Sequence, residues 1–196
     1  MAKAFKRKGG RFIARLDEVE REVVVGLLEQ TQTFLAPAHR EPTGDPFDDL
    51  VATLGVRRPE EPGAGPGQVP RDPALERLLP TAHREDPAMA AEFRRLTEHG
   101  LRERKTANLA TAIAALRGAD EDKVSLDQEQ AQAMVVALTD VRLLLGERLG
   151  LRTDEDADAL QDRFEAASED DPELYLAAYY DFMTWLQESL TQALMA

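Results

Sequence analysis

Three stretches decide the fold: EHGLRERKTANLATAIAAL (98–116), LTDVRLLLGERLGL (138–151) and ELYLAAYYDFMTWLQESLTQAL (173–194). In each of them apolar residues recur every three or four positions, which is the period of an α-helix with one buried face. Each stretch also carries charged residues within or beside that apolar face. The pattern predicts packed helices that are held in register by buried or half-buried polar pairs.

The charged residues within these apolar faces are Arg102, Arg104, Lys105, Arg142 and Asp181. A charge enclosed by apolar side chains is costly unless an opposite charge accompanies it. We therefore expect Arg142 and Asp181 to be largely buried and paired, either with each other or with Asp140 and Arg102. This buried polar network of Arg142, Asp181 and Asp140 is predicted to set how the helices meet.

Start and stop signals place four main helices at 17–35, 87–116, 125–149 and 172–194. Asp17 and Glu20, like Ser125 and Gln128, have capping-box spacing, in which two side chains satisfy the free N–H groups of a helix start. Asp-Pro pairs precede the second and fourth helices, where proline suits the first helical position. Shorter helices are predicted at 46–54, 73–80 and 153–164.

A β-hairpin is predicted at 3–16, which reads KAFKRKGGRFIARL. Two adjacent glycines between short alternating runs favour a tight turn, because both positions can take positive φ. A lone hairpin is only marginally stable in water. We therefore expect Phe5, Phe12 and Leu16 to pack against a helix.

Length and composition predict a mainly helical, single-domain bundle over residues 1–196 with a small N-terminal hairpin. Residues 55–72 are rich in proline and glycine and predict a flexible loop, too short to divide two domains. No apolar run approaches the roughly 20 residues that span a bilayer. The chain has no cysteine, which fits the cytoplasm and excludes thiolate chemistry. We expect a cytoplasmic protein without membrane contact.

No catalytic, cofactor-binding or metal-ligating residue is predicted. His39, His83 and His99 lack a second ligand at metal-site spacing. Phosphate-binding glycine motifs are absent, and the acidic clusters lie where helices begin, where they complement the helix dipole. The sequence therefore indicates a protein that is not an enzyme.

The charge distribution suggests a docking surface. The chain carries a net charge of −13, yet residues 1–16 hold six cations and no acid. The candidate partner-binding residues are Lys6, Arg7, Lys8, Arg11, Arg94, Arg95, Arg102 and Arg104. Two simpler interpretations stay open: the hairpin cations are solvated and balance an acidic body, and the helix arginines form internal ion pairs.

Four segments carry a resemblance to a known family: GGRFIARLDEVEREVV (9–24), EFRRLTEHGLRERKTANLATAIAAL (92–116), LTDVRLLLGERLGL (138–151) and YDFMTWLQESLTQAL (180–194). They resemble, in collinear order, an actinobacterial family formerly of unknown function that includes the oxidative-stress regulator AosR. The resemblance implies a cytoplasmic transcriptional regulator that assists an alternative sigma factor. Redox sensing in that setting uses a cysteine pair, which this chain lacks, so no sensor residue is assigned.

The sequence thus favours a non-enzymatic regulatory protein that acts through protein–protein contacts, with a sigma factor as the partner that the resemblance implies. Two alternatives remain. One is an enzyme whose site is built from dispersed carboxylates and arginines. The other is a DNA-binding protein that uses the basic hairpin as a local patch, since the acidic chain as a whole repels phosphate backbones. The oligomeric state is left open.

Overall fold

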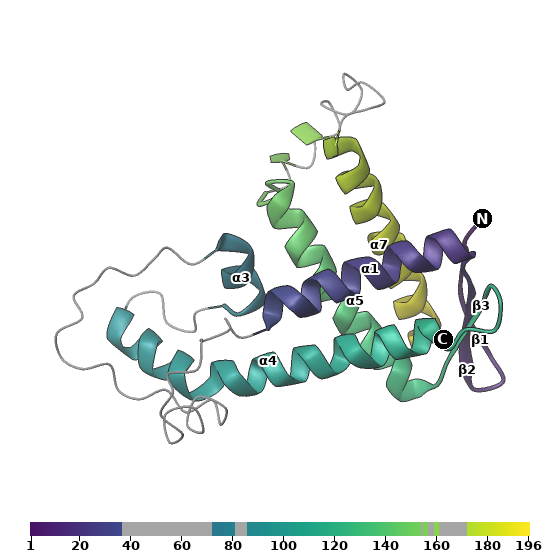
Figure 1. Ribbon diagram of the computed structural model, residues 1–196, viewed down its shortest axis with the longest axis horizontal. Coiled ribbons are helices and arrows are strands. Elements are labelled where there is room, and N and C mark those ends of the chain that lie inside the picture. The colour runs from purple at the N-terminus through teal and green to yellow at the C-terminus, as the bar shows by residue number, and fades with distance from the viewer. Residues whose placement is uncertain (37–71, 81–85, 154, 157–158, 161–171) are drawn as a thin grey trace, which may run out of the picture.

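The fold is mainly helical with a small sheet at the N-terminus, which confirms the predicted fold class. The computed structural model describes residues 1–36, 72–80, 86–153, 155–156, 159–160 and 172–196. Its strands are β1 (Lys3–Lys8), β2 (Arg11–Arg15) and β3 (Lys123–Leu126). Its helices are α1 (Glu18–Leu35), α3 (Pro73–Leu78), α4 (Pro87–Arg117), α5 (Gln128–Arg148) and α7 (Pro172–Met195). Figure 1 shows α4 along the long axis and the sheet at one end of the molecule.

Helix starts follow local sequence signals in most places. Asp17 caps α1, and a capping box with Glu20 is present as predicted. Asp86 caps α4 ahead of a proline in its first turn, also as predicted. The predicted capping box of Ser125 and Gln128 is wrong, because Ser125 lies in β3 and α5 is capped two residues later. There Asp127 accepts from Gln130 N at 2.9 Å, and the Gln130 side chain accepts from Asp127 N at 3.0 Å.

The hairpin forms as predicted, and a third strand extends it. Gly9 and Gly10 form its turn with φ of 58° and 76°, the left-handed values that favour glycine. β2 pairs with β1 on one side and with β3 on the other, both antiparallel. β3 is a four-residue segment more than a hundred residues further along the chain, so local pattern alone does not predict that it pairs with β2.

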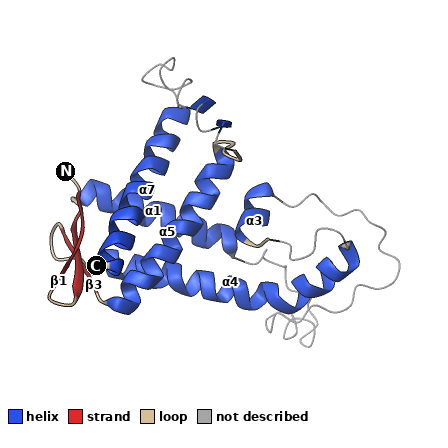
Figure 2. Ribbon diagram, turned by 180° about the vertical axis from the view of Figure 1, so that it is seen from behind, coloured by secondary structure: helices blue, strands red, loops and turns tan. Residues whose placement is uncertain are grey.

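One large core joins the elements on both sides of residues 55–72. It contains Phe5, Phe12 and Leu16 from the sheet region, each at most 4% exposed, together with buried residues of α1, α4, α5 and α7. Burying a side chain of this size contributes about 1.5–3 kcal/mol. The hairpin therefore rests on helices as predicted, and α7 is the helix that packs on β1 (Figures 1 and 2).

Some apolar residues of the predicted helices lie at the surface. Val19 is 71% exposed, Phe93 46% and Leu96 65%. Phe93 and Leu96 lie in the N-terminal part of α4, which extends beyond α1 in Figures 1 and 2, so fewer of the described residues surround it there. Trp185 of α7 is 36% exposed. Amphipathic spacing predicted which side of each helix is apolar, but not how far along its length a partner covers it.

Several predictions fall on residues outside the described set, namely the helix at 46–54, the loop at 55–72, most of the helix at 153–164, His39 and His83. Across the described residues, no helix is long and apolar enough to cross a membrane.

Candidate interaction surface

Asp140 is the most deeply buried charged residue in the described structure, at 1% exposure. Its Oδ1 accepts a hydrogen bond from Lys105 Nζ, which reaches across from α4 to α5. Its Oδ2 is also buried and has no hydrogen-bond partner among the described residues. Burial raises the pKa of Asp140 above its usual range, and the neighbouring Lys105 opposes that rise. Asp140 is thus buried and paired, but its partner is Lys105 and not Arg142 or Asp181, the partners that the sequence predicted.

Arg142 is half-buried between α5 and α7, but its partners are uncharged. Its guanidinium donates to Gln187 Oε1 at 2.7 Å, and it lies 5.3 Å from the centroid of the Tyr180 ring. Asp181, its predicted partner, is exposed, so the prediction that Asp181 is buried and paired is wrong. Successive helical residues are turned by about 100°, so Asp181 faces solvent when Tyr180 faces α5.

Two of the four helix arginines proposed for docking make contacts within the fold. Arg102 donates to Glu98 Oε1 at 2.9 and 2.8 Å and to the Leu35 carbonyl at 2.6 Å, near the end of α1. Arg94 lies 3.8 Å from a carboxylate oxygen of Glu76 and 3.9 Å from one of Glu98. These contacts favour the interpretation that both arginines brace neighbouring helices.

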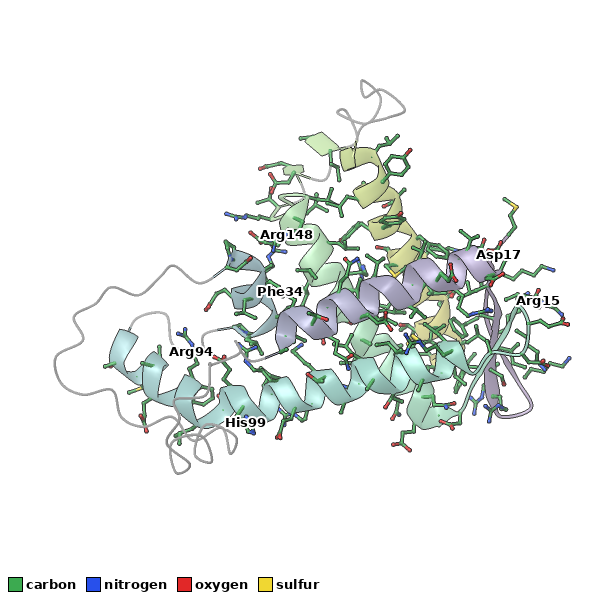
Figure 3. All side chains as sticks on the ribbon, in the orientation of Figure 1. Arg15, Asp17, Phe34, Arg94, His99 and Arg148 are labelled. Carbon is green, nitrogen blue, oxygen red and sulfur yellow. The ribbon has the colours of Figure 1, made fainter. Side chains whose placement is uncertain are left out.

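The predicted basic residues do not form one surface. Figure 3 places Arg94 near one end of the long axis and Arg15, of β2, at the other end. Arg104 is exposed on α4, and the side chain of Arg95 lies outside the described set. A partner of ordinary size therefore meets the hairpin or the start of α4, and the two groups have to be considered separately.

The hairpin presents a basic face to solvent. Residues that pair across strands lie on the same face of a sheet. The register therefore puts Lys6 beside Ile13, Lys8 beside Arg11 and Lys3 beside Arg15, while Phe12 and Ala14 face the core. We call this surface the basic sheet face; its cations are Lys3, Lys6, Lys8, Arg11, Arg15 and Lys123.

Two of these cations contact other strands or turns, whereas the cations near the end of β1 do not. Arg11 donates to Ser125 Oγ at 2.7 Å, and Arg15 contacts Asp122 at 2.8 Å. We refer to Lys6, Arg7 and Lys8 as the hairpin cations. All three are exposed, and none has an ion-pair partner within the part of the chain that the structure describes. Sequence reasoning named these three as candidate contacts, but its candidates did not include Lys3, Arg15 or Lys123; Lys123 joins this face only through β3, which was not predicted.

The described residues offer little that resembles a catalytic centre. They contain no group of three or more His, Cys, Asp or Glu residues placed to hold a metal ion. A shallow depression of about 390 Å³ lies along α1 and the end of α4, and its lining includes Glu18, Glu22, Glu29, Arg21 and Arg117. Within it Glu29 is paired with Arg117.

The chain belongs to a protein family described as "Domain of unknown function (DUF2017)", which matches residues 2–194. The match spans the hairpin and nearly all of the chain. No curated protein and no solved structure matches the sequence. The expected membership of a family of unknown function is thus confirmed. The narrower link to the actinobacterial group that includes AosR is not tested by these matches and stays a prediction.

Proposed function

We propose that this member of the family is a non-enzymatic regulatory protein that binds a protein partner through the basic sheet face and the hairpin cations. The observation that carries the proposal is the exposure of Lys6, Arg7 and Lys8 without ion-pair partners among the described residues. They stand on a chain whose net charge is −13. Cations that are not neutralised within their own fold remain available to another molecule.

The charge contrast indicates an acidic partner. A local positive surface on an acidic protein attracts a negative surface and orients the two molecules before they touch. The rest of the chain, which is negative, repels the same partner and disfavours other orientations. Charge reversal at the hairpin is therefore expected to act mainly on the association rate.

The resemblance described above extends the proposal to transcription. It gives the partner as an alternative sigma factor and the setting as oxidative stress in the cytoplasm. With no cysteine in the chain, the signal would have to reach this protein through its partner or through a route other than its own thiols. The partner and the stress signal are both open to direct test.

The first experiment identifies the partner and then locates the contact. Tagged protein would be used to recover partners from its native cytosol before and after peroxide treatment. Association with the recovered partner would then be timed for the parent and for the combined change Lys6→Glu, Arg7→Glu and Lys8→Glu. We expect slower association that is most evident at low salt, where screening is weakest. Arg104→Glu, which reverses an exposed cation on α4, is the matched control and should bind like the parent.

Unchanged association of the hairpin variant at low salt would contradict the proposed surface. A result in which only Arg104→Glu weakens binding would move the contact to α4.

DNA binding is the second candidate, because the basic sheet face gathers cations on one open surface. A mobility-shift titration over a salt series separates the two. DNA binding through these residues should weaken steeply with salt, roughly in proportion to the phosphates neutralised. Absence of a shift at low salt would leave the protein partner as the function of this face.

A further inference from the structure

The two edges of the sheet differ in how well they are covered. The strand order is β1-β2-β3, so β1 and β3 are the edges. At the β3 edge, Arg11 donates to the Ser125 carbonyl at 2.8 Å, and Lys123 N donates to the Asp120 carbonyl at 2.9 Å. At the β1 edge, Phe5 N donates to Ser189 Oγ of α7 at 3.2 Å. That contact covers only the first half of β1.

The second half of β1 is open. Alternate residues of an antiparallel strand direct their N–H and C=O groups to the same side. The pair Lys8 and Arg11 flanks the two-residue turn, where facing residues exchange backbone hydrogen bonds, so Arg7, one residue earlier, directs its N–H away from β2. Arg7 lies opposite Phe12 in the register. The N–H of Phe5, two residues before Arg7, also points away from β2, toward Ser189. Among the described residues no partner is found for the backbone N–H of Arg7.

An aromatic pair lies on the helix that contacts this edge. Phe182, Trp185 and Ser189 are spaced i, i+3 and i+7 along α7 and therefore share one face of it. The rings of Phe182 and Trp185 are stacked, with centroids 5.8 Å apart and planes at 14°. Trp185 is one turn from Ser189, about 6 Å along the helix axis, and it is 36% exposed. An apolar contact site thus lies on the helix that contacts the β1 edge, one turn from that contact.

We propose that the β1 edge receives an extended, acidic segment of the protein partner as an added strand, and that the Phe182–Trp185 pair receives an apolar side chain of that segment. This inference rests on the proposed function, of which it specifies the binding mode. Backbone N–H and C=O groups of an edge strand pair with another peptide backbone. The hairpin cations beside the edge select acidic side chains on the incoming strand.

The same charges argue against a second copy of this chain as the occupant. Two β1 edges brought together would place Lys6, Arg7 and Lys8 against their own counterparts. Lysines on edge strands discourage such self-pairing. An acidic strand from a different protein meets no such repulsion.

Trp185 makes the inference testable without knowing the partner, because it is the only tryptophan in the chain. The probe is a synthetic peptide of about six residues, the usual length of a strand, with alternating aspartate and valine and no aromatic residue. Titrated into the full chain, it should give a saturable change in tryptophan fluorescence. A peptide with lysine in place of aspartate should give none. The acidic peptide with alternate backbone nitrogens methylated keeps its charge but cannot donate, and it should bind at least about fivefold more weakly.

Two variants of Arg7 distinguish the contribution of its backbone N–H from the contribution of its side-chain charge. Arg7→Pro removes the edge N–H together with the charge, whereas Arg7→Ala removes the charge alone. Proline is tolerated on an edge strand whose N–H faces outward, so circular dichroism should show both variants folded. We expect Arg7→Pro to bind the acidic peptide about fivefold more weakly than Arg7→Ala.

The outcomes distinguish this inference from the function it rests on. If the methylated peptide binds as well as the unmodified one, binding depends on charge alone and strand addition is wrong, while the proposed surface stands. The same holds if folded Arg7→Pro and Arg7→Ala bind alike. If Arg7→Pro does not fold, the methylated peptide still tests strand addition with the parent chain. If the acidic peptide gives no saturable change and single-stranded DNA does, both the inference and the proposed protein partner are wrong.

Discussion

Lys105 and Lys6 show how differently the same residue type is used in two regions of this molecule. Lys105 lies between α4 and α5 and contacts Asp140, which is 1% exposed. Lys6 lies on the open face of the hairpin and has no ion-pair partner in the described structure. The difference arises because a helix face is covered by another helix, whereas one face of the hairpin is left in water.

The half-buried charges in the helices therefore stabilise the fold, whereas the exposed charges of the hairpin remain available for an interaction. Arg102 and Arg142 belong with Lys105, because both are half-buried and hydrogen-bonded to neighbouring helices. Arg7 and Lys8 belong with Lys6. If the assignment is right, substitutions in the first group reduce stability and substitutions in the second group do not.

The largest effect is expected from Lys105→Met. It leaves the Asp140 carboxylate buried without its counter-charge, and stranding a buried charge costs about 3–5 kcal/mol of unfolding free energy. Urea denaturation at neutral pH measures the loss. The control is Lys105→Met combined with Asp140→Leu, which removes both charges and should recover most of the stability. A loss below about 1 kcal/mol in the single variant would mean that Lys105 contributes no more to stability than an exposed surface charge.

A smaller, pH-dependent effect is expected from Asp140 itself. Because burial raises its pKa in the folded chain above 3.8, the folded state binds the proton more tightly than the unfolded state. Its contribution to stability is therefore fully present below pH 3.8 and is lost as the pH rises through the raised pKa. The unfolding free energy of the parent minus that of Asp140→Asn should increase as the pH falls.

The difference between the parent and Asp140→Asn excludes the contributions of other titrating groups. Asp17 has a lowered pKa, chiefly because the backbone N–H of Glu20 donates to it, and its contribution is lost as the pH falls. Such contributions are common to the parent and to Asp140→Asn, so they cancel in the difference. A difference that stays level across the acid range would mean that Asp140 is not desolvated as the structure indicates.

Arg142 and Asp181 form a matched pair for a third test. Arg142→Ala removes a half-buried hydrogen bond and a cation–π contact, for which we expect a loss of about 1–2 kcal/mol. Asp181→Ala removes an exposed charge from the neighbouring helix and should change stability by less than about 0.5 kcal/mol. Thermal and urea unfolding compare the two. Equal losses would restore the original prediction that Arg142 and Asp181 act as one buried pair.

The smallest effect on stability is expected at the hairpin. The combined change Lys6→Glu, Arg7→Glu and Lys8→Glu should shift the unfolding free energy by no more than about 0.5 kcal/mol, because exposed charges contribute little. Urea denaturation measures the shift. A loss comparable to that of Lys105→Met would show that the hairpin cations stabilise the fold, as Lys105 does.

The helices and the hairpin were largely predictable because their signals are local. A capping residue bonds to an N–H group three residues away, as Asp17 does with Glu20, and a two-residue turn needs only Gly9 and Gly10. The exposed cations at Lys6, Arg7 and Lys8 were predictable for a similar reason, since no acid stands near them in the sequence until Asp17. The pairing of the cations in the helices was not predictable in this way.

The sequence by itself determined where most helices begin and end, where the hairpin turns, and that residues 1–16 are basic on an acidic chain. Only the tertiary structure decided that β3 joins the sheet, that Lys105 is the partner of Asp140, and that the backbone N–H of Arg7 on the β1 edge has no partner among the described residues. The physical reason is distance along the chain. Caps and turns are fixed by bonds between near neighbours, whereas coverage and charge pairing depend on which faces meet after the chain has folded.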